Sequence, residues 1–385
     1  MELALTAAQE AFRAEARDWL AAHAPRGPLP PVTTAEGFAA HVAWERRLYQ
    51  ARWAVLPWPA RYGGRDASLL EWLLFEEEYY RAGAPPRVTQ NGIFLLAPAL
   101  LEFGTDEQKQ RLLPPMAAAE TVWAQGWSEP NAGSDLAAVQ SRARRTGGGW
   151  LLSGQKTWST RASVCQAVHG LFRTDPDAKR HEGLTYFMAR LDAPGVRVNG
   201  FRRLDGDVDF AEIFFDDAFV PDRDVLGEVG GGWKVAMSTT GSERGLVLRS
   251  PGRFVAAADR LIELYCRRGR GDARLRDQVV RAWMDAQAYQ LHTLQAVTRI
   301  GDGRPLGAES SVSKLAWSEL DVGLHQTALE LLGELAELDA GAPDAVDGGA
   351  WVRGWQFALA GPIYAGTNEI QRNIVAERLL GLPRG

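Results

Sequence analysis

Glu243, in the segment MSTTGSERGLVLRS (237–250), carries a carboxylate that could take up a proton if its surroundings tune it. Val247 lies one helical turn later on the same face, and Leu246 and Leu248 flank it, so this part of the helix is expected to be buried. Burial raises the pKa of a carboxyl group towards neutrality and makes the carboxylate a better base. A glutamate in a helix is more often a solvated surface residue, so burial alone does not decide its role.

Two other segments carry groups that could hold a phosphate-bearing or aromatic ligand. SEPNAGSD (128–135) combines small residues with free backbone N–H groups; Gly133 allows close approach of the backbone, and Ser134 can donate its hydroxyl. GQKTWST (154–160) adds a tryptophan and several hydroxyl groups. Taken singly, a Gly-Ser pair is usually only a turn and a tryptophan usually belongs to the core. Their occurrence in one predicted β-layer favours a binding role.

The composition is that of an ordinary globular protein. The chain has 385 residues, 46% hydrophobic and 24% charged, enough for two to three packed domains. A net charge of −5 argues against a nucleic-acid-binding protein, which usually carries a basic face. Cys165 and Cys266 have neither metal nor redox spacing, so we expect no metal site and a reducing cytoplasm. We also expect neither a signal peptide nor a membrane span, because no suitable apolar run is present.

The periodicity of the sequence divides the chain into three predicted domains. Residues 1–121 have a helical period, with capping boxes at Thr6–Gln9 and Thr105–Gln108. Residues 122–231 contain short aromatic and β-branched segments separated by Gly, Asp and Pro, which is typical of a small antiparallel β-domain. The helical period returns over 232–385. The expected fold class is therefore α+β, with several domains.

Some elements can be bounded within these domains. A helix is predicted over about 67–82, and its run Glu76-Glu77-Glu78 is interpreted as a solvated face. Loops are predicted at GRGDA (269–273) and GDGRPLG (301–307). Strands are predicted at 150–158, 183–191 and 210–221.

The motifs, taken in order, resemble the acyl-CoA dehydrogenase family. The segment 101–137 is similar to the family's G-T-x-E-Q-K helix followed by a T/S-E-P-x-A-G-S-D loop, and GQKTWST resembles its G-x-K-x-W-I-T strand. FFDDAFVP (214–221), SERG (242–245) and GTNEIQRNIVAERLLGLP (366–383) match as well. The resemblance covers essentially the whole chain and implies the family's fold, with a C-terminal four-helix bundle. It is greatest to a bacterial subgroup that includes enzymes for cyclic, dicarboxylic and steroid side-chain acyl-CoAs.

The resemblance implies an FAD cofactor, which the protein must hold and orient. Trp127 and Ser128 would line the flavin, Trp158 would pack on the isoalloxazine, and Thr160 would lie near N5. Thr367 can cap the last helix, whose N-terminus suits a polar flavin contact. The implied cofactor-binding residues are Gln125, Trp127, Ser128, Gly133, Ser134, Trp158, Ser159, Thr160, Arg267, Gln278, Thr367 and Glu369.

The family's usual base follows the tyrosine of the last loop, but in this chain that position is Ala365, which cannot accept a proton. A minority of members carry the glutamate on the helix after the β-domain, immediately before an arginine, as Glu243 stands before Arg244. The resemblance therefore implies Glu243 as the base. The implied substrate contacts are Ser134, Arg244, Tyr364, Ala365 and Gly366, and an alanine at 365 leaves room for a bulky acyl group.

Two segments depart from the contacts that a dimer mate makes to FAD in the family. RRGRGDARLRDQ (267–278) keeps Arg267 and Gln278 at matching spacing, but Arg270 replaces a phenylalanine. ELLGELA (330–336) has glutamates in place of a glutamine and a glycine, and acidic groups repel a diphosphate. Either the site tolerates the change, or the chain pairs with a different chain to make fewer, complete flavin sites. The altered positions are Glu330, Glu334 and Ala336.

The predicted activity is FAD-dependent α,β-dehydrogenation of an acyl-CoA to the trans-2-enoyl-CoA, with electrons passed to an electron-transfer flavoprotein. The implied assembly is a homotetramer or an α2β2 heterotetramer with a related chain. One alternative is a flavin oxidase, hydroxylase or carrier-protein-linked dehydrogenase on the same fold. Another is a non-catalytic subunit that contributes only flavin-tail contacts. The length, branching and ring content of the acyl group, and the choice between CoA and a carrier protein, stay open.

Overall fold

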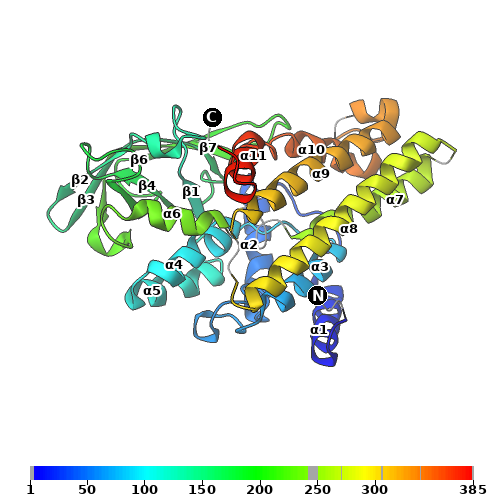
Figure 1. Cartoon of the computed structure of the whole chain (residues 1–385), viewed down its shortest axis with the longest axis horizontal. Coiled ribbons are helices and arrows are strands. Elements are labelled where there is room, and N and C mark those ends of the chain that lie inside the picture. The colour runs from blue at the N-terminus through cyan, green and yellow to red at the C-terminus, as the bar shows by residue number, and fades with distance from the viewer. Residues whose placement is uncertain (1–3, 242–249, 270, 305–306, 339, 384–385) are drawn as a thin grey trace. The chain divides into compact units, whose positions relative to one another are not determined.

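The structure is a computed structural model, and it describes residues 4–241, 250–269, 271–304, 307–338 and 340–383 (Figure 1). The chain forms two compact units. The first, called the sheet unit, consists of residues 27–67 and 85–243. The second, called the bundle unit, consists of residues 1–26, 68–84 and 244–385. The predicted three-domain boundaries, at 121/122 and 231/232, stay a prediction.

The sheet unit is built on a mostly antiparallel sheet. In the described residues its strand order is β6-β7-β3-β2-β4-β5-β8, and β1 pairs in parallel with β4. Alternate residues of β7, including Ile213 and Phe215, are buried in the core with Leu152 of β3. The three predicted strands are confirmed as β3, β5 and β7. The bounds are β1 (Trp123–Gly126), β2 (Arg142–Thr146), β3 (Gly149–Thr160), β4 (Ala167–Arg173), β5 (Leu184–Arg190), β6 (Val196–Phe201), β7 (Phe210–Pro221) and β8 (Val225–Leu226).

Helices of the same unit accompany the sheet. The predicted capping box of α5 is confirmed: Thr105 Oγ1 accepts from the Gln108 backbone N–H at 3.2 Å, and Gln108 Oε1 accepts from the Thr105 N–H at 2.9 Å. Gln108 Nε2 also donates to the carbonyls of Arg223 and Val225, which ties α5 to β8. The helices are α2 (Ala35–Gln50), α4 (Ala97–Phe103), α5 (Asp106–Ala117) and α6 (Gly232–Gly241).

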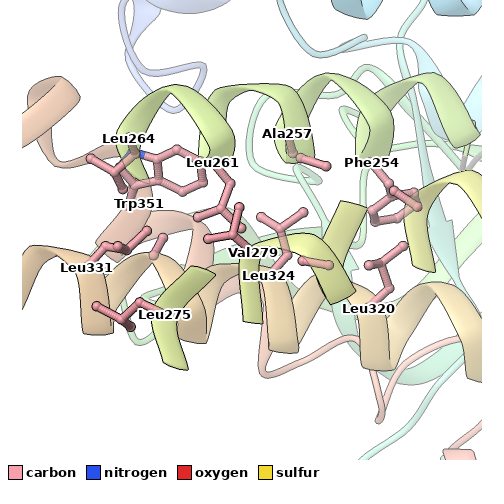
Figure 2. Packing of buried hydrophobic residues seen from close by; sticks show 14 of the residues in the cluster. Phe254, Ala257, Leu261, Leu264, Leu275, Val279, Leu320, Leu324, Leu331 and Trp351 are labelled. Carbon is pink, nitrogen blue, oxygen red and sulfur yellow. The ribbon is translucent and has the colours of Figure 1, made fainter. Parts of the chain in front are cut away.

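The bundle unit is helical and has its own apolar core. In Figure 2 the labelled side chains of α7, α8 and α9 point towards one another, with Trp351 of α10 beside them. The described residues of the predicted loop segments 269–273 and 301–307 lie between these three helices or at their ends, and residues 270 and 305–306 lie outside the described part. Thr6 caps α1 as predicted. The bounds are α1 (Ala7–His23), α3 (Leu69–Arg81), α7 (Pro251–Arg268), α8 (Ala273–Gly301), α9 (Glu309–Leu332), α10 (Ala350–Ala358) and α11 (Asn368–Ile374). The expected α+β class, with helices on both sides of a β-region in the sequence, is confirmed.

The acidic run of α3 is not a solvated face, and that prediction was wrong. Glu76 and Glu78 are only 3% and 2% exposed. Glu78 accepts hydrogen bonds from Arg13 Nε at 2.7 Å, Arg17 Nε at 3.0 Å and Arg81 Nη1 at 2.7 Å. Burial alone would raise the pKa of Glu78, but the bonds from Arg17 and Arg13 outweigh it and lower the pKa to about 2. Arginines of α1 thus make the burial of this carboxylate tolerable.

Candidate functional site

A strained tryptophan stands on the surface of β3. The pairing of β3 with β7 shifts between Lys156 and Ser159, which marks a β-bulge. At the bulge Trp158 has φ +58°, a left-handed conformation that a bulky residue adopts only when the surrounding structure forces it. Its side chain is 61% exposed and is held edge-to-face by Phe201 and Phe210, at centroid distances of 5.1 and 5.6 Å. The indole therefore offers an exposed face on which a flat ring can stack.

The SEPNAGSD loop lies next to this strand in the sheet unit. The backbone N–H of Thr157 donates to the carbonyl of Ser128 at 2.9 Å, so the start of the loop is bonded directly to β3. Glu129 and Ala132 then exchange two backbone hydrogen bonds of 3.0 Å, which closes a tight turn. A Cβ added at Gly133 would meet no atom within 4 Å. Packing within the chain therefore does not require a glycine here, which leaves space on that side of the loop for a ligand.

A buried ion pair links the SEPNAGSD loop to β3. Lys156 is fully buried, and its Nζ lies 2.7 Å from Glu129 Oε1 and 2.7 Å from the carbonyl of Leu171. Glu129 also accepts from the backbone N–H groups of Gln140 and Ser141, at 2.6 and 2.9 Å. Burial lowers the pKa of Lys156, and Glu129 opposes that shift. The pair joins one predicted cofactor segment to the other through side chains that the sequence reasoning had not assigned.

A chain of buried hydrogen bonds fixes Trp127. Its Nε1 donates to the hydroxyl oxygen of Tyr186 at 3.0 Å, and that oxygen lies 2.6 Å from His169 Nδ1. An indole nitrogen only donates, so the hydroxyl accepts from Trp127 and can donate its own hydrogen to a neutral imidazole. Burial lowers the pKa of His169 to about 3, although the backbone of Asn91 raises it slightly. The neutral histidine thus orients Tyr186 and, through it, Trp127.

Acid is expected to destabilise the protein through His169. Because the pKa falls from 6.5 in the unfolded chain to about 3 in the fold, unfolding takes up a proton between these values. The stabilising contribution is complete above about pH 6.5 and is lost as the pH falls towards 3, at up to ~1.4 kcal/mol per pH unit. Urea unfolding at several pH values should show a shallower decline below neutrality for His169→Gln than for the wild type. Parallel curves would contradict this assignment.

The remaining predicted cofactor residues of the sheet unit gather around the same strand. Thr160 ends β3, half-buried, and its carbonyl accepts from Asn91 Nδ2 at 3.4 Å. Ser159 is fully buried, and its Oγ has no hydrogen-bond partner among the described residues. Gln125 Nε2 on β1 is likewise buried and without a partner in the described part of the chain. Ser159 Oγ and Gln125 Nε2 are thus buried polar groups for which the described chain supplies no partner.

In the bundle unit, the loop before α11 holds the predicted substrate residues. Ala365 and Gly366 have φ values of +56° and +82°, and Gln371 Nε2 donates to both of their carbonyls at 3.3 Å. Tyr364 stacks on Trp317 of α9 at a centroid distance of 5.8 Å. The loop is therefore held in one conformation by α9 and α11, and it presents no carboxylate at position 365.

The N-terminus of α11 is capped as predicted. Thr367 Oγ1 accepts from the backbone N–H of Ile370 at 3.3 Å. Asn368 Oδ1 accepts from the buried Lys314 Nζ at 2.6 Å and from Ser318 Oγ at 3.1 Å. Glu369 is exposed at the end of the helix. Thr367 and Glu369 thus lie on a rigidly anchored turn.

Arg267 and Gln278 each contact an acidic residue of their own chain. Arg267 Nη2 lies 2.9 Å from Asp347 Oδ2. Gln278 Nε2 lies 3.3 Å from Glu330 Oε2, and Glu330 also forms an ion pair with Arg274. The hydrogen bond from Arg274 is the main cause that lowers the pKa of Glu330, so this carboxylate is charged at neutral pH. Glu330, which replaces the expected glutamine, therefore binds the side chains of both Arg274 and Gln278.

Glu243 and Arg244 lie outside the described residues. Of the predicted site residues that the structure describes, Gln125, Trp127, Ser128, Gly133, Ser134, Trp158, Ser159 and Thr160 belong to the sheet unit, and Arg267, Gln278, Tyr364, Ala365, Gly366, Thr367 and Glu369 belong to the bundle unit. The sequence reasoning missed Glu129, Lys156, His169 and Tyr186 as supporting residues. The available signal was a lysine and a histidine at inward-facing positions of two strands, β3 and β4.

Family models match nearly the whole chain. The N-terminal, middle and C-terminal domains of acyl-CoA dehydrogenase match residues 6–120, 124–218 and 230–380. The chain belongs to the acyl-CoA dehydrogenase family. This acyl-CoA dehydrogenase is therefore a flavoprotein oxidoreductase that acts on acyl-CoA thioesters. No helix in the described part of the chain combines the length and apolar character that crossing a membrane requires.

Relatives and solved structures support the assignment. The acyl-CoA dehydrogenase is 39% identical to acyl-CoA dehydrogenase IpdE1 of Mycobacterium tuberculosis over 383 residues, which covers 97% of this chain and 98% of the relative. The solved Tcur3481-Tcur3483 steroid ACAD matches with a TM-score of 0.89 and 26% identity, covering both chains fully. The ChsE4-ChsE5 complex from Mycobacterium tuberculosis matches with a TM-score of 0.85 and 28% identity, again over the full length of both chains.

The residues of the sheet unit fit a flavin. An isoalloxazine needs a flat apolar surface on which to stack, and the exposed indole of Trp158 offers one. A diphosphate needs an open backbone, and the loop around Gly133 is open. We therefore take the SEPNAGSD loop and the Trp158 bulge as the residues that would hold the flavin.

Proposed function

We propose that the protein converts an acyl-CoA to the trans-2-enoyl-CoA, with FAD as cofactor and Glu243 as the base. The observation that carries the proposal is the Trp158 bulge joined to the SEPNAGSD loop, because it combines a stacking surface with an open, firmly anchored backbone. Replacement of the usual glutamate by Ala365 supports a base elsewhere in the chain.

The proposed reaction needs two groups on opposite sides of the substrate. Glu243 removes the α-proton, and the β-hydrogen leaves with its electron pair as the C2–C3 double bond forms. The flavin, when bound, accepts that hydride and later passes the electrons to an electron-transfer flavoprotein. Trp158 and Trp127 would help to hold the flavin ring in place. Tyr364 would form part of the wall of the acyl pocket.

We propose a bulky, cyclic acyl group as the substrate class. The similar Tcur3481-Tcur3483 structure, at 26% identity, is that of a steroid ACAD. Ala365 has only a methyl side chain where a glutamate is common, which leaves volume next to the reacting carbons.

For the assembly, we propose an α2β2 complex with a related chain rather than a homotetramer. The charged Glu330, bonded to Arg274 and Gln278, would repel the diphosphate of a flavin bound by a second copy. Two of the similar solved structures are complexes of two named chains, ChsE4-ChsE5 and Tcur3481-Tcur3483. This chain would be the catalytic member of the pair, since it keeps Glu243 and the flavin loop.

Replacing Glu330 by glutamine is expected to raise the affinity of the isolated chain for FAD. The change removes one negative charge and releases Arg274, and a single charge near a solvated diphosphate is worth roughly 1 kcal/mol, or about fivefold in the dissociation constant. Titration of FAD followed by flavin fluorescence at low salt measures it. Glu337→Gln, an exposed glutamate outside the cluster, is the matched control. Equal affinities for wild type and Glu330→Gln would show that this side chain does not face the cofactor.

The decisive experiment for the function is anaerobic reduction of the purified, FAD-loaded protein by cyclic and linear acyl-CoAs. Bleaching of the flavin absorbance, with formation of the enoyl-CoA, supports the dehydrogenase. Fast reoxidation by O₂ would instead favour the oxidase alternative. Protein that never takes up FAD, alone or with its partner chain, would favour the non-catalytic subunit.

A further inference from the structure

Arg253 occupies an unfavourable position for a cation. It lies in the first turn of α7, which begins at Pro251 and is capped by Ser250 Oγ, and the partial positive charge of a helix N-terminus repels a guanidinium. The opposing charge comes from Asp321 of α9, which is 2% exposed and accepts from Arg253 Nη2 at 2.8 Å. Burial alone would lower the pKa of Arg253, but Asp321 and the neighbouring Tyr364 and Tyr80 raise it, so the group stays charged.

Aromatic rings surround this guanidinium. Its carbon lies 5.3 Å from the ring centroid of Phe254 and 5.8 Å from that of Phe357. Phe357 in turn packs on Tyr364 at 6.4 Å. Arg253 is therefore next to the aromatic cluster that includes the proposed wall of the acyl pocket.

Most of the N–H donors of Arg253 have no acceptor among the described residues. A guanidinium carries five N–H donors. Among the described residues, Asp321 is the acceptor that Arg253 contacts, and a quarter of the arginine side chain remains exposed. Such an arginine would not help a pocket to bind a plain hydrocarbon acyl group. Partly desolvated N–H donors without acceptors lower the stability of the protein.

The charge of the pair indicates what kind of acceptor would suit it. Asp321 already neutralises Arg253, so a second carboxylate would be repelled by the aspartate. A carbonyl or hydroxyl oxygen carries no net charge and accepts from the free N–H groups without that penalty.

We propose that Arg253 is a specificity-determining residue that binds a neutral carbonyl or hydroxyl oxygen on the acyl group, away from the thioester. The inference rests on the proposed function, because it takes Tyr364 as part of the acyl pocket. It deepens that function by making the substrate an oxygenated cyclic acyl-CoA rather than a plain hydrocarbon one.

Binding of enoyl-CoA products tests the proposal without turnover. The ligands are cyclohexylpropenoyl-CoA and its two derivatives with a ketone or a hydroxyl on the ring carbon opposite the side chain. Calorimetry gives the affinity of the full-length, flavin-loaded protein for each. The double variant Arg253→Met/Asp321→Asn removes both charges together, and Arg253→Lys keeps the charge but loses the planar fork. Thermal unfolding and flavin content report on folding.

The wild type is expected to prefer at least one oxygenated ligand by roughly tenfold to a hundredfold, the effect of one charge-assisted hydrogen bond. The double variant should abolish that preference, and Arg253→Lys should reduce it. A purely structural Arg253–Asp321 pair would weaken all three ligands in parallel, which overturns the proposal, as does a wild type without preference. A preference that depends on Arg253 in a protein whose flavin no acyl-CoA can bleach would uphold this inference and reject the dehydrogenase.

Discussion

Replacing Glu243 by glutamine is expected to lower kcat by ~10²–10⁴-fold, the usual effect of losing a general base. Glutamine keeps the size of the side chain and its hydrogen-bonding capacity but cannot take up the α-proton. Because no carboxylate is present at position 365, the chain has no substitute at the family's usual base position. Flavin content should be unchanged, since Glu243 is proposed to act on the substrate and not on the cofactor.

Stopped-flow reduction of the flavin by an acyl-CoA measures this effect directly, because it isolates the chemical step from electron transfer. Glu263→Gln, an exposed glutamate on α7, makes the same chemical change away from the proposed site and should behave as the wild type. Wild-type reduction rates in Glu243→Gln would refute the assignment of the base. Recovery of activity in Glu243→Gln/Ala365→Glu would show that the two positions reach the same carbon.

Replacing Lys156 by methionine is expected to destabilise the fold by about 3–5 kcal/mol, because it leaves a buried carboxylate without its partner. Glu129 would keep its two backbone hydrogen bonds but lose the ammonium at 2.7 Å. The same change should weaken FAD binding, since the ion pair fastens the SEPNAGSD loop to β3. Urea unfolding and FAD titration measure the two effects.

A second variant separates charge burial from packing. Lys156→Met/Glu129→Gln has no orphaned charge, so it should recover most of the lost stability. The exposed ion pair between Asp135 of the same loop and Arg180, which lies between β4 and β5, is the control, and Arg180→Met should cost less than about 1 kcal/mol. If Lys156→Met were no worse than Arg180→Met, the buried pair would not hold the loop.

Local signals predicted the elements well. The capping boxes at Thr6 and Thr105, and the alternating pattern of β7, depend only on residues a few positions apart. The acidic run of α3 could not be interpreted in that way. Its counter-charges come from Arg13 and Arg17, which lie more than fifty residues earlier in the sequence. A run of glutamates looks solvated until the helix that covers it is known.

The residues of the candidate site likewise fall into two groups, those that local sequence motifs predicted and those that they did not. The loop and strand that would hold the flavin were predicted from motifs, because each motif is a short continuous segment. The groups that support them were not. Tyr186 reaches Trp127 only because β1 and β5 pair with the two edges of β4, and Lys156 meets Glu129 only because β3 lies beside the loop that follows β1. Strand order and register, which join distant residues, have no local signature.

The bundle unit is assembled from three separated stretches of chain, and this affects how the protein is made. During synthesis α1 and α3 leave the ribosome long before α7 and α8, against which α3 packs. Until then α3 lacks the two later helices against which it packs in the folded unit. The nascent protein therefore exposes part of the apolar surface of α3 until the last third of the chain has been synthesised. Release of a prematurely terminated polypeptide would leave that helix as a target for chaperones and proteases.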